Sequence, residues 1–427
     1  MIKYGVIGNN LSHSYAPVVH NMFFNLYSID GNLEKLEIQQ EEFDKIDMHE
    51  FLRGFKGVNV SAPYKTQIMS HIDEVDDEAR EIGSINTINN VNGKLIGYNT
   101  DARGFAELLE ITHIKPKGKT FVILSAGGTA RSVVHAIKKY AKDIVCVSKD
   151  LDVKIDGARI VSFESLPYLK ADVLVDATPV GMYPNIDEQV VDDSIVANYE
   201  TIIDLVYNPV FTKLLQTGVK QGKYVVSGLY MLVSQAVQSQ SIWQGVNLQG
   251  MIKRIFSEAT IHTQMQMNGN IYIIGMLGCG KTELGKALAK EMKKDFIDLD
   301  DMIVKMSGKT IKELYDEGEE VFRAWETKAL IKVAFEKGKV IALGCGAVLN
   351  RTNLAAVKAS GIVILRDRSM DKILSTFEMG KYPNVNSRED VIRIYNERYP
   401  RYVGLADYIV PFGDVDLDVK KIAEVLK

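Results

Sequence analysis

The feature that most constrains this chain is a complete phosphate-binding loop. Residues 275–282 read Gly-Met-Leu-Gly-Cys-Gly-Lys-Thr, which fits the pattern G-x-x-x-x-G-K-[ST]. An apolar run, 271–274, precedes the loop, and a segment with helical spacing follows it. Backbone N–H groups at a helix N-terminus then surround an anion. We expect the phosphates to contact Gly275, Met276, Leu277, Gly278, Cys279, Gly280, Lys281 and Thr282, with the Thr282 hydroxyl on magnesium.

The loop lies about two-thirds of the way along the 427-residue chain. The residues before it exceed what one domain needs, so we expect another activity upstream. Strand-like runs alternate with amphipathic helical runs, which predicts α/β domains with parallel sheets. The polar stretch from Thr260 to Asn270 has no clear period and contains Gly269, so it is the predicted linker. The predicted parts are 1–103, 104–228, helices within about 229–260, a linker at 261–269, and 270–427.

The upstream part has a series of predicted strands and helices. A first strand is expected at Lys3–Ile7, and a new series of strands starts near Thr120. The later strands are predicted at Phe121–Leu124, Ile144–Val147, Val173–Asp176, Ile202–Leu205 and Tyr224–Val226, and helices at Ser132–Tyr140, Met231–Trp243 and Leu248–Glu258.

Composition narrows the class of function. A net charge of −4 gives no electrostatic case for nucleic acid or an anionic membrane as the partner. No apolar run reaches the ~20 residues of a membrane span, and the N-terminus resembles a first strand more than a signal peptide. The cysteines Cys146, Cys279 and Cys345 are too scattered for a metal site. We expect a cytoplasmic protein with free thiols that acts on small molecules, as a monomer or a homodimer.

A second Gly-containing turn, Ser125–Arg131, lies between a predicted strand and a predicted helix. Gly127 and Gly128 would let the backbone approach a pyrophosphate at a helix N-terminus. An ordinary turn between a strand and a helix explains the same pattern. The residues of the next strand distinguish a cofactor site from such a turn.

That next strand ends in Ser148-Lys149-Asp150, and Lys154 follows closely. NAD-binding folds place an acidic residue at this position, where it holds the ribose hydroxyls. The lysines suit the additional 2′-phosphate of NADP, whereas Asp150 and Asp152 oppose it. The pattern favours NADP(H) and leaves NAD open.

Polar clusters in the first hundred residues indicate a small-molecule site. They are Ser12-His-Ser14, Asn59-Val-Ser-Ala-Pro-Tyr-Lys65, Asn86-Thr87 and Asn99-Thr-Asp101. Each cluster alone could be a capped loop, because Ser, Asn and Asp favour turns. Lys65 and Asp101 both follow such clusters, and a Lys–Asp pair within hydrogen-bonding distance could protonate a ketone as it becomes an alkoxide.

Together these strings resemble shikimate dehydrogenase over residues 1–260. The matching segments also include Gly83-Ser-Ile-Asn-Thr87, Gly97–Phe105, Asp204-Leu-Val-Tyr-Asn-Pro209 and Met231-Leu-Val-Ser-Gln-Ala236. The resemblance implies that Lys65 transfers the proton beside Asp101. It implies that the remaining substrate contacts come from Ser12, Ser14, Asn59, Ser61, Asn86, Tyr207 and Gln235.

The same resemblance implies an α/β substrate domain, completed by the helices of 229–260, and a Rossmann-type dinucleotide domain. Ser125 stands where the family usually has Gly, Ser61 where it usually has Thr, and Lys149 where it commonly has Arg. Lysine keeps the charge of arginine without its planar fork. The implied NADP contacts are Ala126, Gly127, Gly128, Thr129, Ser148, Lys149, Lys154, Thr178, Gly181, Met182 and Gly228.

Acidic and glycine-rich segments follow the phosphate loop. Asp298 and Asp300 fall at the end of a predicted strand, where they would share one face. One could serve magnesium while the other meets an acceptor hydroxyl. A second Gly turn, Gly344-Cys-Gly346, follows a strand predicted at Val340–Leu343 and offers further N–H groups to an anion.

Residues 270–410 resemble shikimate kinase, which implies a P-loop kinase domain with a parallel sheet. The resemblance assigns Asp300 to the reacting hydroxyl, Asp298 with Thr282 to Mg²⁺, and Lys281 to the phosphates of ATP. It implies that the substrate is bound by Asp300, Arg323, Gly344, Cys345, Gly346 and Arg398. The departures are Cys345 for Gly, Glu283 for a small hydroxyl residue, and Lys381-Tyr-Pro383 where the lid normally carries Arg-Pro.

These resemblances predict a bifunctional enzyme that reduces 3-dehydroshikimate with NADPH and phosphorylates shikimate with ATP. One alternative is a working dehydrogenase fused to an impaired or regulatory kinase-like domain. Another is a nonenzymatic sensor, which would be expected to lose Lys65, Asp101, Lys281 or Asp300. All four are present.

Overall fold

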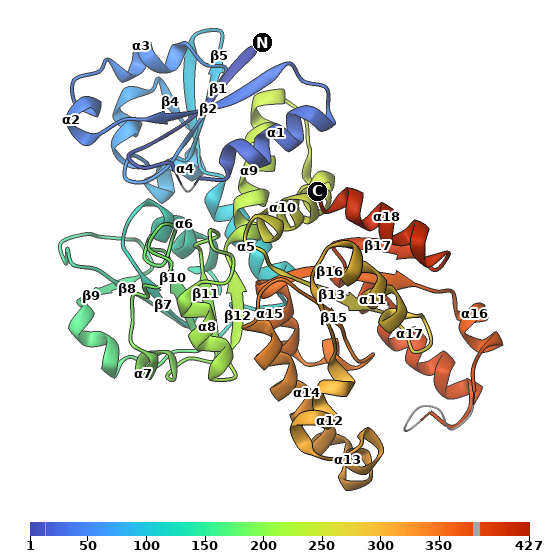
Figure 1. Cartoon of the computed structure of the whole chain (residues 1–427). Coiled ribbons are helices and arrows are strands. Elements are labelled where there is room, and N and C mark those ends of the chain that lie inside the picture. The colour runs from blue at the N-terminus through green and yellow to red at the C-terminus, as the bar shows by residue number, and fades with distance from the viewer. Residues whose placement is uncertain (13, 379–384) are drawn as a thin grey trace. The chain divides into compact units, whose positions relative to one another are not determined.

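The computed structural model describes residues 1–12, 14–378 and 385–427. The chain divides into two compact units, Met1–Ala259 and Thr260–Lys427 (Figure 1). Helix α10, Ile252–Gln266, crosses from one unit into the other.

The first unit begins with a six-stranded mixed sheet in the order β2-β1-β3-β5-β6-β4. Strand β1 pairs in parallel with β2 and β3, whereas β5 runs antiparallel to β3 and β6. The elements are β1 (Ile2–Gly8), α1 (Ala16–Leu26), β2 (Gly31–Glu37), α2 (Gln40–Phe43), α3 (Met48–Arg53), β3 (Gly57–Val60), the 3-10 helix η1 (Gln67–His71), β4 (Glu74–Val75), α4 (Asp77–Ile82), β5 (Thr87–Val91) and β6 (Lys94–Tyr98).

The second sheet of this unit is six-stranded, with the order β12-β11-β10-β7-β8-β9, and all its pairs are parallel. This is the doubly wound order of dinucleotide-binding folds, and it confirms the Rossmann-type prediction. The elements are α5 (Asp101–Ile111), β7 (Thr120–Leu124), α6 (Gly128–Ile137), β8 (Asp143–Val147), β9 (Arg159–Val161), η2 (Phe163–Tyr168), β10 (Val173–Asp176), α7 (Asp193–Val196), β11 (Thr201–Asp204), α8 (Lys213–Lys220) and β12 (Tyr224–Ser227).

Helices α5 and α9 tie the two sheets of this unit together. Helix α9 is Leu229–Gln244, followed by η3, Gln249–Met251. Its residues from Leu229 to Trp243 share a buried core with β1 and α1, although they follow the dinucleotide sheet in sequence. The chain thus returns to the first sheet. Helix α5 spans the predicted domain boundary at 103/104.

The second unit has a five-stranded sheet in the order β14-β15-β13-β16-β17, with every pair parallel. The elements are β13 (Asn270–Ile274), α11 (Lys281–Glu291), β14 (Asp295–Asp298), α12 (Leu299–Ser307), α13 (Ile311–Glu317), α14 (Glu319–Ala334), β15 (Lys339–Ala342), η4 (Ala347–Leu349), α15 (Arg351–Ser360), β16 (Gly361–Asp367), α16 (Met370–Ser375), α17 (Arg388–Leu405), β17 (Tyr408–Pro411) and α18 (Val415–Val425).

The segment predicted as a linker, 261–269, is mostly helical. Helix α10 continues to Gln266, and only 267–269 form a turn before β13. Ile261 and Met265, four residues apart, pack into the core of the second unit, so this polar segment carries a short helical period. The division between units falls between Ala259 and Thr260.

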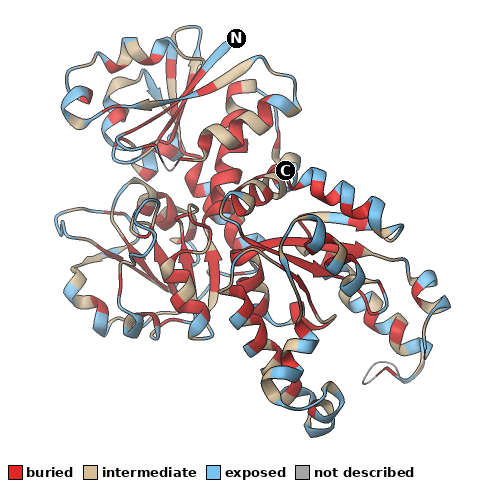
Figure 2. Cartoon of the chain, in the orientation of Figure 1, coloured by how far each residue is buried: buried red, intermediate tan, exposed pale blue. Residues whose placement is uncertain are grey.

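The central strands of each sheet are buried and the outer helix faces are exposed (Figure 2). In the second unit, the buried Arg366 of β16 forms an ion pair with Asp418 of α18; their side chains are 1% and 6% exposed. The Arg366 guanidinium also donates to the carbonyl oxygens of Pro411 and Gly413, at 3.1 and 3.0 Å. These contacts join α18 to the sheet.

We predict that Asp418→Asn destabilises the second unit by about 3 kcal/mol, because it leaves a buried guanidinium without its carboxylate. Hydrogen exchange of the amides of β13 and β16 measures the change. Asp416→Asn is the control, since Asp416 lies on the same helix and is exposed. Equal exchange rates in the two variants would contradict the assigned role of the ion pair.

Candidate active sites

A buried ion pair lies where the two sheets of the first unit meet. Lys65, in the turn after β3, donates from Nζ to Asp101 Oδ2 at 2.5 Å, and Asp101 is the first residue of α5. The side chains are 14% and 6% exposed. Lys65 Nζ also donates to Thr129 Oγ1, in the first turn of α6, at 3.1 Å. The ammonium is therefore held between the substrate sheet and the dinucleotide sheet.

Asn86 connects this ion pair to helix α9. Its Nδ2 donates to Asp101 Oδ1 at 2.9 Å and to Gln235 Oε1 at 3.2 Å. Its Oδ1 accepts from the Thr100 N–H at 2.7 Å. Asn86, Thr100, Asp101 and Gln235 are all buried. The structure thus brings three predicted residues into one hydrogen-bonded group with Lys65.

Asn59 extends the network to Ser239, which was not predicted from sequence. Its Nδ2 donates to Ser239 Oγ at 2.9 Å and to Thr87 Oγ1 at 3.2 Å. Asn59 Oδ1 is buried without a hydrogen-bond partner among the described residues, so it retains accepting capacity. Ser239 lies one helical turn after Gln235, and that i, i+4 spacing was the signal available in the sequence.

The remaining predicted substrate contacts differ in how deeply they are buried. Ser14 is buried and hydrogen-bonds Tyr207, whose pKa is raised to about 12 mainly by burial. The charge of Asp101 contributes to that increase, which places Tyr207 within electrostatic range of the Lys65–Asp101 pair. Ser12 is exposed, and its Oγ donates to Asn10 Oδ1 at 2.8 Å. Ser61 is partly buried next to β3, and His13 lies outside the described residues.

The dinucleotide turn packs closely against Lys65. Gly127 is the N-cap of α6. A Cβ on Gly128 would lie 2.8 Å from the Cβ of Lys65, so this position requires glycine. Ser125 has φ +134°, a region that favours glycine, and its Oγ accepts from the Gly127 N–H at 3.0 Å. Ala126–Thr129 therefore presents amides to an anion at the start of a ten-residue helix.

The rim beyond β8 is basic. Lys149 and Lys154 are exposed, and Ser148 is partly buried. Arg131, in the first turn of α6, donates from Nη1 to the Lys154 carbonyl oxygen at 3.1 Å. Arg131 is a cation that the sequence analysis did not assign, although it ends the Gly-rich string. The residues present thus fit a phosphorylated dinucleotide.

The remaining predicted dinucleotide contacts follow β10 and β12. Thr178 donates its N–H to Asp176 Oδ1 at 2.8 Å, and Gly181 has φ +81°. Met182 lies in the same loop. Gly228 caps α9, where a Cβ would lie 2.2 Å from the Leu205 carbonyl oxygen, so no other residue fits.

Two buried carboxyl groups lie directly behind this loop. Asp176 and Asp204 end the adjacent parallel strands β10 and β11 and are paired in register. Burial raises the pKa of Asp176 to about 7, and burial together with Asp176 raises the pKa of Asp204 well above its usual range. Thr212 Oγ1 donates to Asp204 Oδ2 at 2.6 Å, whereas Asp176 Oδ2 has no partner among the described residues. The two carboxyl groups thus favour holding a proton.

In the second unit, the phosphate loop has the backbone that its motif requires. Gly275, Gly278 and Gly280 have φ values of +146°, +67° and +82°. Lys281 Nζ donates to the carbonyl oxygens of Gly275 and Met276, at 3.0 and 2.9 Å. Lys281 therefore extends along the loop that would hold the phosphates.

The predicted metal ligands lie together. Thr282 Oγ1 donates to Asp298 Oδ2 at 2.8 Å, so a hydroxyl and a carboxylate face each other at the end of the phosphate loop. Oxygen ligands of this kind suit Mg²⁺, which usually keeps several waters. The described ranges contain no group of three or more His, Cys, Asp or Glu side chains that could hold a metal ion.

The expectation that Asp298 and Asp300 share a strand face is wrong. Strand β14 ends at Asp298, whose Oδ1 accepts the Asp300 N–H at 3.1 Å and caps α12. Asp300 thus lies in the first turn of that helix. The pKa of the Asp300 carboxyl is raised, mainly because neighbouring protein atoms reduce its hydration. The negative charge of Asp298 raises it further. Its carboxylate lies beside the second Gly turn, because a Cβ on Gly344 would be 3.3 Å from Asp300 Oδ1.

Arg323 also faces the second Gly turn. Its Nη1 donates to Glu326 Oε2 at 2.8 Å, and the Glu326 side chain is 1% exposed. A Cβ on Gly346 would lie 2.3 Å from Arg323 Nη1, so glycine leaves room for the guanidinium. Glu326 was not assigned a role from sequence, although it lies three residues after Arg323 on one helix face. Burial raises the pKa of Glu326, which Arg323 opposes.

Cys345 fits its turn without strain, since its φ is not positive. Arg398 Nη1 lies 3.1 Å from Cys345 Sγ, and Tyr402 Oη donates to the Cys345 carbonyl oxygen. Arg398 Nε is buried without a hydrogen-bond acceptor in the described part of the chain. Together with Arg323, Arg398 places two guanidinium groups around the turn, as a carboxylate-bearing ligand requires.

A further cation beside the phosphate loop was not predicted. Arg368 donates to the Gly278 carbonyl oxygen, and its guanidinium lies over the Phe412 ring at 4.3 Å. Its position just after β16 gave no motif by which it could be found. The predicted lid residues, Lys381, Tyr382 and Pro383, lie outside the described residues.

The geometry defines the class of protein. The first unit is an α/β oxidoreductase-type fold with a Lys–Asp pair at a dinucleotide turn, and the second is a P-loop phosphotransferase-type fold. No helix in the described part of the chain has the length and apolar character to cross a bilayer. Both sites are built for small molecules.

Comparison with known proteins narrows this class. The family model for the shikimate dehydrogenase substrate binding domain matches residues 6–88, and that for shikimate kinase matches residues 277–427. A shikimate dehydrogenase (NADP(+)) of Clostridium beijerinckii is 38% identical over 253 residues, 57% of this chain and 93% of that protein.

Solved structures agree for the first unit. Shikimate dehydrogenase 1 of Peptoclostridium difficile is 36% identical with a TM-score of 0.59, covering 62% of this chain and 99% of that one. A shikimate 5-dehydrogenase from Thermus thermophilus, in complex with NADP(H) and shikimate, is 28% identical with a TM-score of 0.53, covering 61% and 100%. The chain belongs to the shikimate dehydrogenase family and carries a fused shikimate kinase domain.

The carboxyl pair behind the dinucleotide loop predicts a pH dependence. A raised pKa in the folded state means that the native protein binds the proton more tightly than the unfolded chain. The free energy of unfolding of the first unit should therefore fall as pH rises from about 3.8 to about 7, by up to about 1.4 kcal/mol per pH unit for one proton. Asp176→Asn should flatten this dependence.

The measurement is urea unfolding followed by fluorescence of Trp243, which is buried in the first unit, in a Trp325→Phe background. Asp187→Asn is the control because Asp187 is exposed in the loop before α7. A slope unchanged by Asp176→Asn would rule out the shared proton.

Proposed function

We propose that the first unit reduces the ring ketone of 3-dehydroshikimate to shikimate, and that the second unit phosphorylates shikimate. The observation that supports the reductase most directly is the 2.5 Å contact between Lys65 and Asp101, beside the first turn of α6. The observation that supports the kinase is the pairing of Thr282 with Asp298 at the end of the phosphate loop.

In the reductase, Lys65 is the proton donor. The bound NADPH supplies the hydride that adds to the carbonyl carbon. As the carbonyl oxygen becomes an alkoxide, Lys65 Nζ gives it a proton, and solvent later restores the ammonium. Asp101 orients the Lys65 ammonium, and Asn86 fixes Asp101 through its second oxygen. Ser12 and Ser14 bind the substrate carboxylate, and Ser61 and Tyr207 lie around the substrate ring.

The amide side chains of Asn59, Asn86 and Gln235 bind the hydroxyls of the substrate. Ala126–Thr129, the loop from Thr178 to Met182, and Gly228 would hold the dinucleotide. Lys149 and Lys154, with Arg131 beside them, receive the 2′-phosphate, which favours NADP(H) over NAD. On the same rim, Asp150 Oδ1 accepts from the Asp152 N–H at 3.0 Å, so this carboxylate is already engaged locally.

In the kinase, charge neutralisation and positioning are the main contributions. Bound ATP supplies the phosphoryl group, and Thr282 and Asp298 would hold its Mg²⁺. Lys281 moves from its loop carbonyls to the outer phosphates, and Asp300 orients the acceptor hydroxyl. Arg323 and Arg398 bind the shikimate carboxylate against Gly344–Gly346, where Cys345 contributes its backbone N–H.

We infer that the protein works in the cytoplasm, as a monomer or a homodimer, with no nucleic acid or membrane partner. The net charge of −4 and the three free cysteines support this inference. The second candidate, an active dehydrogenase joined to an impaired kinase, rests on Lys381 in the lid, because lysine cannot make the bidentate phosphate contact of arginine.

We predict that Lys65→Ala lowers kcat of the reductase by at least about a hundredfold, since a positioned acid contributes that much or more. The assay follows NADPH oxidation with 3-dehydroshikimate. Phosphorylation of shikimate by the same sample should change less than about twofold, which shows that the chain is folded. Near-normal ketone reduction in the variant would refute the role of Lys65.

We predict that Lys281→Ala lowers ATP-dependent phosphorylation of shikimate by at least about a hundredfold, because it removes the cation on the outer phosphates. Reductase activity should persist and serves as the control. Retained phosphorylation would refute the phosphate-loop assignment. A wild-type chain that reduces 3-dehydroshikimate but does not phosphorylate shikimate would favour the impaired kinase.

A further inference from the structure

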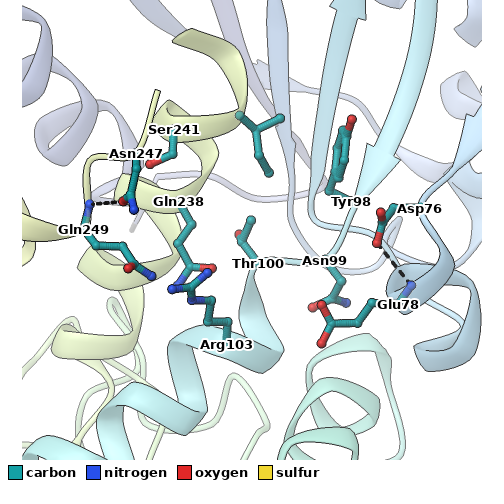
Figure 3. A pocket seen from close by; sticks show the side chains of 11 residues that line it. Asp76, Glu78, Tyr98, Asn99, Thr100, Arg103, Gln238, Ser241, Asn247 and Gln249 are labelled. Atoms are coloured by element: carbon teal, nitrogen blue, oxygen red, sulfur yellow. Dashed lines mark hydrogen bonds between the residues drawn. The ribbon is translucent and has the colours of Figure 1, made fainter. Parts of the chain in front are cut away.

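The first unit contains a polar cavity of about 280 Å³ that the proposed reductase does not use. It lies between the start of α4, the end of β6, the first turn of α5 and the C-terminal half of α9 (Figure 3). None of the proposed catalytic or substrate-binding residues lines it. Its lining residues are Asp76, Glu78, Tyr98, Asn99, Thr100, Arg103, Gln238, Ser241, Ile242, Asn247 and Gln249.

Opposite charges face each other across this cavity. Figure 3 shows Asp76, Glu78 and Tyr98 on one side, and Arg103 with Gln238 on the other. Burial raises the pKa of the Tyr98 phenol, and the negative charge of Asp76 raises it further. The wall formed by Asp76, Glu78 and Tyr98 is therefore suited to a cationic group, and the wall with Arg103 to an anionic one.

The wall with Arg103 and Gln238 retains unused hydrogen-bonding groups. Arg103 Nε donates to Glu107 Oε1 at 3.2 Å, whereas its two Nη groups donate to none of the described residues. Gln238 is 7% exposed, and its Nε2 donates to Ser234 Oγ at 3.1 Å. Its Oε1 accepts no hydrogen bond from the described part of the chain. An amide oxygen without a donor can accept a hydrogen bond from a ligand or a water in the cavity.

We propose that this cavity binds a free amino acid with a basic side chain. Two carboxylates and one guanidinium in the lining complement a ligand with one carboxylate and two cationic groups. The ligand's carboxylate meets the Nη groups of Arg103, and its cationic groups meet Asp76 and Glu78, with Gln238 Oε1 as a further acceptor. Ile242 is the single aliphatic side chain in the lining, so the ligand is polar along most of its length.

The test is calorimetric titration of the full-length chain with L-arginine and, separately, with agmatine, which lacks the carboxylate. L-arginine should bind with a Kd below about 1 mM. Arg103→Gln should weaken L-arginine binding by at least about tenfold and change agmatine binding little, because only the carboxylate contact is lost. Glu78→Gln should weaken both ligands.

The matched control is Arg254→Gln. Arg254 Nε donates to Glu258 Oε1 at 3.1 Å across the same i, i+4 spacing as Arg103 and Glu107, but it lies outside the cavity. Reduction of 3-dehydroshikimate should stay near the wild-type rate in all three variants, which shows that they are folded. The proposal is overturned if wild-type protein gives no heat with L-arginine at about 10 mM, or if Arg254→Gln weakens binding as much as Arg103→Gln.

Discussion

The contact between the Lys65 ammonium and the Asp101 carboxylate is the interaction on which the first site depends. Isolated, a buried ion pair is costly, because both charges lose their hydration. Here Asn86 satisfies the second Asp101 oxygen and Thr129 receives another Lys65 proton. These contacts come from the loop before β5, from α5 and from α6, so the pair forms only when both sheets of the unit are in place. Catalytic geometry and tertiary structure are therefore coupled.

Motifs that combine a fixed spacing with a backbone requirement were readable from the sequence. The phosphate loop and the Gly127–Gly128 turn both lie between a strand and a helix, as predicted. The predicted strand Val173–Asp176 matches β10 at both ends. Buried parallel strands are short apolar runs bounded by polar residues, so their limits are well marked.

Interactions between distant segments could not be read in this way. Asn59 meets Ser239 across 180 positions, and no local pattern marks such a partnership. The sequence predicted a strand through Asp300, but a helix starts at Leu299. The Asp300 N–H donates to the Asp298 side chain, and this cap favours the helix over a longer strand. The helical end of α10 was missed because Ile261 and Met265 provide too few apolar positions for a clear period.

The two sites solve different electrostatic problems with different means. In the first, one developing alkoxide needs one proton, and a single ammonium, held by Asp101 beside an amide network, is sufficient. In the second, a triphosphate and a carboxylate bring several negative charges, so the site spreads the compensation over loop amides, Lys281, Arg323 and Arg398. Burying that many cations would be costly without the bound ligand. The Arg323–Glu326 contact partly offsets this cost, since Glu326 neutralises a guanidinium that faces an open substrate turn.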